Sequence, residues 1–181
     1  MKKQTPITTL SFFKYESIKS KIWAFGMMQF AHKHLQNVDG MGFYKLMGSG
    51  KQLGRPFADW SVYALLQVWE DESHADKFIR GSSLFSKYRQ QAAQHCSIYM
   101  KCLSTHGEWS KQTPFLPVQN HDKSNPYVAV ITRATIKSRW LWTFWRQAIK
   151  SEKPIHSAEG LLYAKGIGEV PLKHMATFSI W

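Results

Sequence analysis

The sequence has few cysteines. Only Cys96 and Cys102 occur in 181 residues. They lie on one predicted strand an even number of residues apart, so their side chains share a face about 20 Å from each other, too far for a disulfide. Neither their spacing nor neighbouring histidines suggest a zinc site. We therefore expect two unpaired thiols in a reducing, cytoplasmic compartment.

Long hydrophobic runs and nucleotide-binding loops are also lacking. The longest charge-free apolar run, residues 22–31, is about half the length that a bilayer requires. Residues 1–3 have the charge of a signal-peptide start, but the polar residues and Lys14 that follow favour a strand. The glycine motifs at 48–50 and 166–168 do not stand between a strand and a helix. They predict hairpin turns or bulges, and the sequence shows no nicotinamide or flavin fingerprint.

Acidic residues are scarce as well. Twelve Asp and Glu against 24 Lys and Arg give a formal charge of +12, which would attract phosphates, anionic lipid or nucleic acid alike. The chain also contains eight Trp, seven Tyr, eleven Phe and seven Met, more large apolar surface than a core of this size usually needs. This combination favours an oily ligand or a membrane face as a partner.

Hydrophobic periodicity predicts the same series of elements twice. The first series is strand 8–15, helix 18–36, strands 42–48 and 60–69, helix 72–94 and strand 97–109, with a kink or break at 81–83. The second series is strand 127–136, a helix from Ser138, and strands 161–168 and 174–181. It stops before its second helix and fourth strand. A segment rich in proline and asparagine separates them, so we predict a first unit 1–110, a linker 111–126 and a truncated second unit 127–181.

A βαββαβ unit covers one sheet face with helices and leaves the other face bare, so two such units tend to pack sheet on sheet. We therefore predict an α+β fold in which ferredoxin-like βαββαβ repeats form a dimeric α+β barrel, with the second repeat incomplete. An unrelated α+β sandwich is the alternative. The helix at 18–36 is apolar over more than a third of its circumference, so we expect it to contact two apolar bodies.

Several segments resemble the spheroidene monooxygenase family of carotenoid biosynthesis. These segments are residues 10–13 with 23–25, residues 42–48, residues 132–135, and residues 165–171 running into His174 and 177–181. The resemblance covers nearly the whole chain. Family members are usually longer and continue past the equivalent of residues 179–181 into a final helix and strand, which agrees with the incomplete second repeat.

The resemblance implies oxygen-dependent oxidation of an acyclic carotenoid such as spheroidene near its end group, with haem as the cofactor. Electrons would come from a partner such as a ferredoxin. A carotenoid lies in a bilayer whose cytoplasmic leaflet is anionic, so peripheral contact with the inner face of the membrane is expected. A homo-oligomer is also expected. The alternative function is a non-catalytic protein of the α+β barrel type that binds haem or another hydrophobic ligand.

The resemblance also suggests site residues. Haem iron requires an axial ligand aimed into an apolar pocket; His174 is the first candidate for this metal ligand, and a solvent-facing turn histidine is the alternative. Arg133 and Lys165 would either pair with haem propionates or lie at an exposed rim. Glu169 would either deliver protons to bound oxygen as a catalytic residue or form a salt bridge with Lys173.

The tryptophans and arginines after Ser138 raise the question of nucleic-acid binding. Their helical spacing fits a buried stripe with a charged flank better, so we expect no nucleic-acid partner. The residues expected in this stripe are Trp140, Leu141, Phe144, Trp145 and Ala148.

Overall fold

Two units make up the computed structural model, which describes residues 5–53, 55–119, 121–170 and 174–181. The first unit contains Met1–Leu46 and Ala64–Lys123, and the second contains Met47–Tyr63 and Ser124–Trp181. Two strands, at Met41–Gly50 and Ala58–Trp69, form a hairpin whose outer part, Met47–Tyr63, is thus grouped with the second unit. The division predicted around residues 111–126 stays a prediction.

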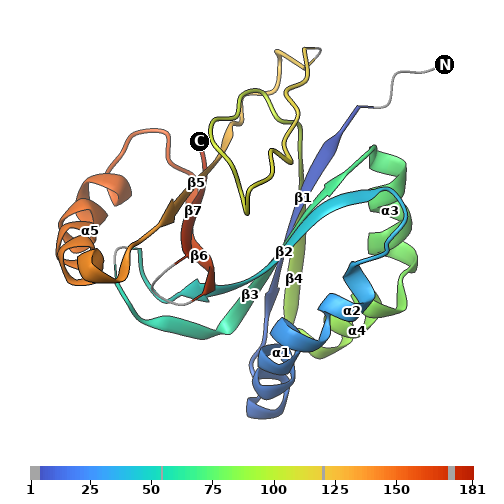
Figure 1. The fold of residues 1–181 in the computed structure, drawn as a ribbon, viewed down its shortest axis with the longest axis horizontal. Helices are drawn as coiled ribbons and strands as arrows, with labels where there is room; N and C mark the ends of the chain where they lie inside the picture. The colour runs from blue at the N-terminus through green and yellow to red at the C-terminus, as the bar shows by residue number, and fades with distance from the viewer. Residues whose placement is uncertain (1–4, 54, 120, 171–173) are drawn as a thin grey trace. The chain divides into compact units, whose positions relative to one another are not determined.

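The first unit forms a complete ferredoxin-like repeat (Figure 1). Its strands lie in the order β4-β1-β3-β2, and β1 and β4 are antiparallel. This order follows from a βαββαβ chain in which each crossover helix joins two strands on the same face of the sheet. The elements are β1 (Ile7–Lys14), α1 (Ile18–Phe30), α2 (His32–Leu35), β2 (Met41–Gly50), β3 (Ala58–Trp69), α3 (Glu72–Gly81), α4 (Ser83–Gln91) and β4 (Gln94–Met100).

Short polar residues start the helices of this unit. Ser17 and Asp71 accept hydrogen bonds from the free N–H groups at the starts of α1 and α3. Ser82 has an extended backbone and caps α4, so the single helix predicted over 72–94 is broken where the sequence indicated. None of the helices in the described part of the chain is long and apolar enough to cross a bilayer.

Aromatic packing joins these helices to the sheet. The buried ring of Phe13 on β1 contacts Phe85 and Tyr88 of α4. Trp69, at the end of β3, contacts Phe78 of α3 and donates a 2.9 Å hydrogen bond to the hydroxyl of Thr9. The indole N–H is therefore satisfied inside the core, as a buried tryptophan requires.

The other face of this sheet is covered by the segment that follows β4. Tyr44 of β2 contacts His32 of α2, so its neighbour Phe43 points away from the helices. The rings of Trp109 and Phe115 both pack against Phe43. Part of the predicted linker therefore contributes to the core of the first unit.

The strand order β1-β3-β2 of the first unit returns in the second unit as β5-β7-β6, with no counterpart of β4 among the described residues. Its elements are β5 (Ala129–Thr135), η1 (Ser138–Trp140), α5 (Leu141–His156), β6 (Tyr163–Val170) and β7 (His174–Ile180). β7 pairs antiparallel with both β5 and β6, and the end of β2 pairs with β6. No helix or strand follows β7 in the described residues. The predicted α+β fold with ferredoxin-like repeats is confirmed.

One prediction about an apolar helix face is wrong. Trp140 is exposed rather than buried, because residues 138–140 form a 3₁₀ turn whose spacing differs from that of the following helix. α1 buries only one side, through Ser20 and Ala24, and Ile22 on its opposite side is exposed. The expectation that α1 contacts two apolar bodies stays a prediction.

The aromatic contacts of Phe13 give a stability prediction. Phe13→Ala should lower the free energy of unfolding by about 3–5 kcal/mol, because it removes a fully buried ring and leaves a cavity. Urea unfolding followed by circular dichroism measures the change. Phe57→Ala removes an exposed ring and should stay within about 0.5 kcal/mol of the unsubstituted chain. Equal losses in both variants would contradict this account of the core.

Candidate functional site

One face of the second unit's sheet brings Arg133 and His174 together. The strand register places Arg133 of β5 opposite Ala176 of β7, and Thr135 opposite His174. Paired residues point to the same face and side chains alternate along a strand, so Arg133 and His174 are diagonal neighbours. Nη2 of Arg133 lies 3.5 Å from Nδ1 of His174.

A β-bulge adds Glu169 to this pair. Gly168 pairs with Met175 and Val170 pairs with His174, so Glu169 is an extra residue in β6. Such bulges redirect a side chain locally, and Oε1 of Glu169 lies 3.6 Å from Nε of Arg133. A Cβ at Gly168 would meet the carbonyl oxygen of His174 at 2.6 Å, so this close approach requires glycine. The bulge predicted from the 166–168 motif is confirmed.

A second ion pair lies on the same face. Nζ of Lys165 is 3.0 Å from Oδ2 of Asp59, and both side chains are less than one-fifth exposed. Lys165 pairs with Phe178 across β6 and β7, and Phe178 pairs with Ile131, two residues before Arg133. The two cations therefore share one sheet face with the buried ring of Phe178.

Charge on this face is balanced. Two carboxylates compensate two cations, which a largely buried charge requires because its hydration is lost. Tyr63 lies on the same face of β3 as Asp59 and is buried. Burial, and then the charge of Asp59, raise the pKa of Tyr63. Its phenol therefore stays protonated at neutral pH and can act as a hydrogen-bond donor.

Three of the four residues suggested from the sequence thus form one cluster of Arg133, Glu169 and His174, and Lys165 lies on the same face. Arg133 and Lys165 are not at an exposed rim, since their side chains are only 19% and 18% exposed. The proposed partner of Glu169, Lys173, lies outside the described residues. A carboxylate, a guanidinium and an imidazole in contact can pass a proton or hold an anionic oxygen.

Asp59 and Tyr63 were missed by the sequence analysis. The signal was present, because Asp59, Ser61 and Tyr63 alternate along one face of a strand. Alternation alone could not show that Asp59 meets a lysine 106 residues further along the chain.

The described residues do not fit haem with His174 as its ligand. An axial histidine normally donates its second ring N–H to a carboxylate or carbonyl, whereas Nδ1 of His174 faces the guanidinium of Arg133. Arg133 and Lys165, suggested for the propionates, are each within ion-pair distance of a protein carboxylate. The geometry therefore supports an acid–base cluster better than a haem site.

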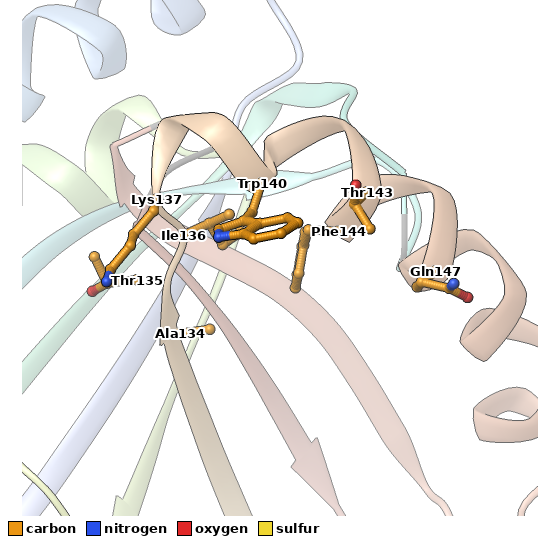
Figure 2. A pocket seen from close by; sticks show the side chains of 8 residues that line it. All are labelled: Ala134, Thr135, Ile136, Lys137, Trp140, Thr143, Phe144 and Gln147. Atoms are coloured by element: carbon orange, nitrogen blue, oxygen red, sulfur yellow. The ribbon is translucent and has the colours of Figure 1, made fainter.

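An apolar hollow of about 590 Å³ lies on the other face of this sheet, between β5 and α5 (Figure 2). Ala134 and Ile136 alternate with Arg133 and therefore point away from the ion pairs. In Figure 2 the indole of Trp140 lies between Ile136 and Phe144. The hollow is lined by Ala134, Thr135, Ile136, Lys137, Trp140, Thr143, Phe144 and Gln147. The hollow and the charged cluster are thus two separate features of the second unit.

The sequence is 33% identical over 179 residues to the spheroidene monooxygenase of Rhodobacter capsulatus, covering 97% of this chain and 74% of that protein. The chain belongs to the spheroidene monooxygenase family. The spheroidene monooxygenases of Cereibacter sphaeroides (29% identity, 96% of this chain and 53% of that protein) and Rubrivivax gelatinosus (32%, 90% and 63%) are also similar. The chain therefore spans between about half and three-quarters of its relatives' length. The resemblance found in the sequence is confirmed, and the family assignment makes the chain an oxidoreductase of the monooxygenase class.

No protein-family model matches the sequence. Among solved structures, SnoaB, a cofactor-independent oxygenase from Streptomyces nogalater, is 11% identical with a TM-score of 0.41, covering 57% of this chain and 99% of that chain. A TM-score below 0.5 carries no argument about function.

The part-buried pair of Lys165 and Asp59 gives a second stability prediction. Lys165→Met should lower the free energy of unfolding by about 2–3 kcal/mol, because it leaves the part-buried Asp59 carboxylate without its cation. Urea unfolding at neutral pH measures the change. The control is Lys77→Met, whose pair with Asp39 is three-quarters exposed and should contribute less than about 1 kcal/mol. A cost for Lys165→Met no larger than that of the control would show that the charges on this face are well hydrated.

Proposed function

We propose that this chain is a monooxygenase that oxidises an acyclic carotenoid near its end group, giving a hydroxyl group and then a keto group. The observation that carries the proposal is the 33% identity to a spheroidene monooxygenase over 97% of the chain. Two further relatives carry the same name. The chain spans only part of the length of these relatives. That the chain itself catalyses the oxidation is therefore part of the proposal.

The reaction defines what the site must supply. Insertion of one oxygen atom into a C–H bond consumes O₂, two electrons and two protons, and yields the alcohol and water. We assign proton delivery to Glu169, which lies at the bulge within 3.6 Å of Arg133 and is 17% exposed. Arg133 and His174 act as positioning residues, because Arg133 pairs with this carboxylate and His174 contacts Arg133.

The electrons must come from outside the chain. We infer a small one-electron carrier protein such as a ferredoxin as the donor, because the sequence contains no nicotinamide or flavin fingerprint. We also propose that the protein works at a membrane surface, where a carotenoid lies. Haem is the cofactor suggested by the family resemblance, but the described residues do not fit it, so no step is assigned to haem.

The role of Glu169 is tested by turnover of a carotenoid. Glu169→Gln should lower kcat about 10²- to 10⁴-fold, because the amide cannot transfer the proton. The assay supplies spheroidene, a ferredoxin with its reductase and ¹⁸O₂, and measures labelled product by mass spectrometry. Glu169→Asp should retain more activity and a shifted pH profile, and the exposed Glu108→Gln should behave like the unsubstituted chain.

The outcomes of this assay separate two claims. If the unsubstituted chain forms no labelled product, the proposed oxidation is wrong. If it forms product and Glu169→Gln does so at the same rate, the function stands and the role of Glu169 is wrong.

Haem binding is tested by titrating the purified chain with haemin and following visible absorption. The geometry around His174 predicts that no saturating haem band depends on this residue, so His174→Ala and His121→Ala should give the same titration. His121 is an exposed control. A band that disappears in His174→Ala alone, with unchanged circular dichroism, would show that His174 is a haem ligand after all.

A further inference from the structure

α5 presents one aromatic and two basic side chains to solvent along a single line. Trp142 is 81% exposed, more than any other large apolar side chain among the described residues. Arg146 and Lys150 are also exposed. Because the three residues are spaced four apart, they follow one another on the same side of the helix over about 12 Å of its axis.

α5 packs on its own sheet through a different side. Leu141, Trp145 and Ala148 are spaced four and three residues apart and are only partly exposed, so they mark the side that faces the sheet. At 100° per residue, the centre of the line through Trp142 and Lys150 lies about 130° around the helix from this packed side. Turning α5 to bury Trp142 would expose Trp145. The helix therefore cannot cover both tryptophans within its own unit.

The two cations on this line have no negative partner in the chain. Between residues 123 and 151 the sequence contains no aspartate or glutamate. Neither Arg146 nor Lys150 forms an ion pair with any residue that the structure describes. The less exposed cations of the same unit, Arg133 and Lys165, each lie beside a carboxylate instead. The positive charge on α5 is thus left for an external group.

An exposed tryptophan beside uncompensated cations has the composition of a protein-binding surface. Trp and Arg are the side chains that most often dominate the binding energy of protein interfaces. Exposed cations also attract an oppositely charged partner from a distance and orient it on arrival. A partner that fits this line of α5 carries carboxylates around an apolar contact.

We propose that this face, made by Trp142, Arg146 and Lys150 and called here the α5 face, docks the acidic surface of a small electron-carrier protein. Carboxylates of the carrier lie against Arg146 and Lys150, and its apolar contact covers Trp142. Complexes between redox proteins have some of the smallest protein interfaces, which suits a face of this length. The need for a carrier rests on the proposed oxidation, whereas the position of the docking surface follows from α5 itself.

Charge and size make other occupants less suitable. A second copy of the chain carries the same net charge of +12, and like charges oppose association. Proteins that bind nucleic acid typically neutralise several phosphates, whereas the α5 face offers two cations among the described residues. A protein with a few surface carboxylates matches both the sign and the extent of the face.

The test measures docking alone, without carotenoid, oxygen or turnover, so a chain that fails to oxidise its substrate can still pass it. The full chain is titrated into a fluorescently labelled acidic [2Fe–2S] ferredoxin, and in a second series into an acidic flavodoxin, and anisotropy is followed. At least one carrier should bind. Raising the ionic strength from about 0.02 M to about 0.2 M should weaken that binding about tenfold, because salt screens exposed charges.

A charge-reversal variant locates the contact. Arg146→Glu with Lys150→Glu should weaken carrier binding about tenfold or more, because it places like charges against the carboxylates. Glutamate is a good helix former, and circular dichroism checks that α5 is retained. The matched control, Lys101→Glu with Lys123→Glu, changes the net charge equally at two exposed lysines outside the second unit. It should have a much smaller effect.

Trp142 is tested separately. Trp142→Ala should weaken carrier binding by about 2 kcal/mol, or roughly thirtyfold, if the ring is the centre of the contact. Alanine has the highest helix propensity, so the substitution keeps α5. The control Phe57→Ala removes another exposed ring of the same unit and should leave binding unchanged.

Three results would overturn the inference. The first is the absence of salt-dependent binding of the unsubstituted chain to either carrier. The second is carrier binding by the α5 variants that equals binding by their controls. The third is binding of a single-stranded oligonucleotide that the α5 variants abolish while carrier binding is unaffected, which would make nucleic acid the true occupant.

Discussion

The hydrogen-bonded register of β5, β6 and β7 decides which side chains of the second unit can meet. Register places Thr135 opposite His174, which brings Arg133 within 3.5 Å of the imidazole. A slip of one residue would move every side chain of β5 to the other face. Arg133 would then point into the hollow beside α5, and Glu169 would lose its cation. The charged cluster is therefore a consequence of backbone pairing rather than of side-chain attraction.

Paired, part-buried charge gives this face its chemical character. Each cation lies beside a carboxylate, and the surrounding residues of the sheet are largely apolar. Such pairs contribute little net stability, because desolvation offsets their attraction, but they exclude arrangements in which one charge is left unpaired. This constraint also explains the poor fit to haem. Propionates placed beside Arg133 or Lys165 would have to displace Glu169 or Asp59 from an existing pair.

The first unit depends on apolar packing rather than on paired charges. Its aromatic side chains fill both faces of the sheet. Apolar groups in the sheet are covered by the chain itself.

The sequence by itself determined the repeated order of elements, the α+β class and the family. Each follows from local periodicity or from motifs that are read without knowing any long-range contact. It also placed Arg133, Glu169 and His174 in the second unit as candidates. Only the tertiary structure decided that these three form one cluster, that Lys165 pairs with Asp59 and that Trp140 is exposed. Those facts depend on strand register, on one bulge and on a single 3₁₀ turn. Each of these is set by the packing of segments distant in the chain, which local sequence patterns do not specify.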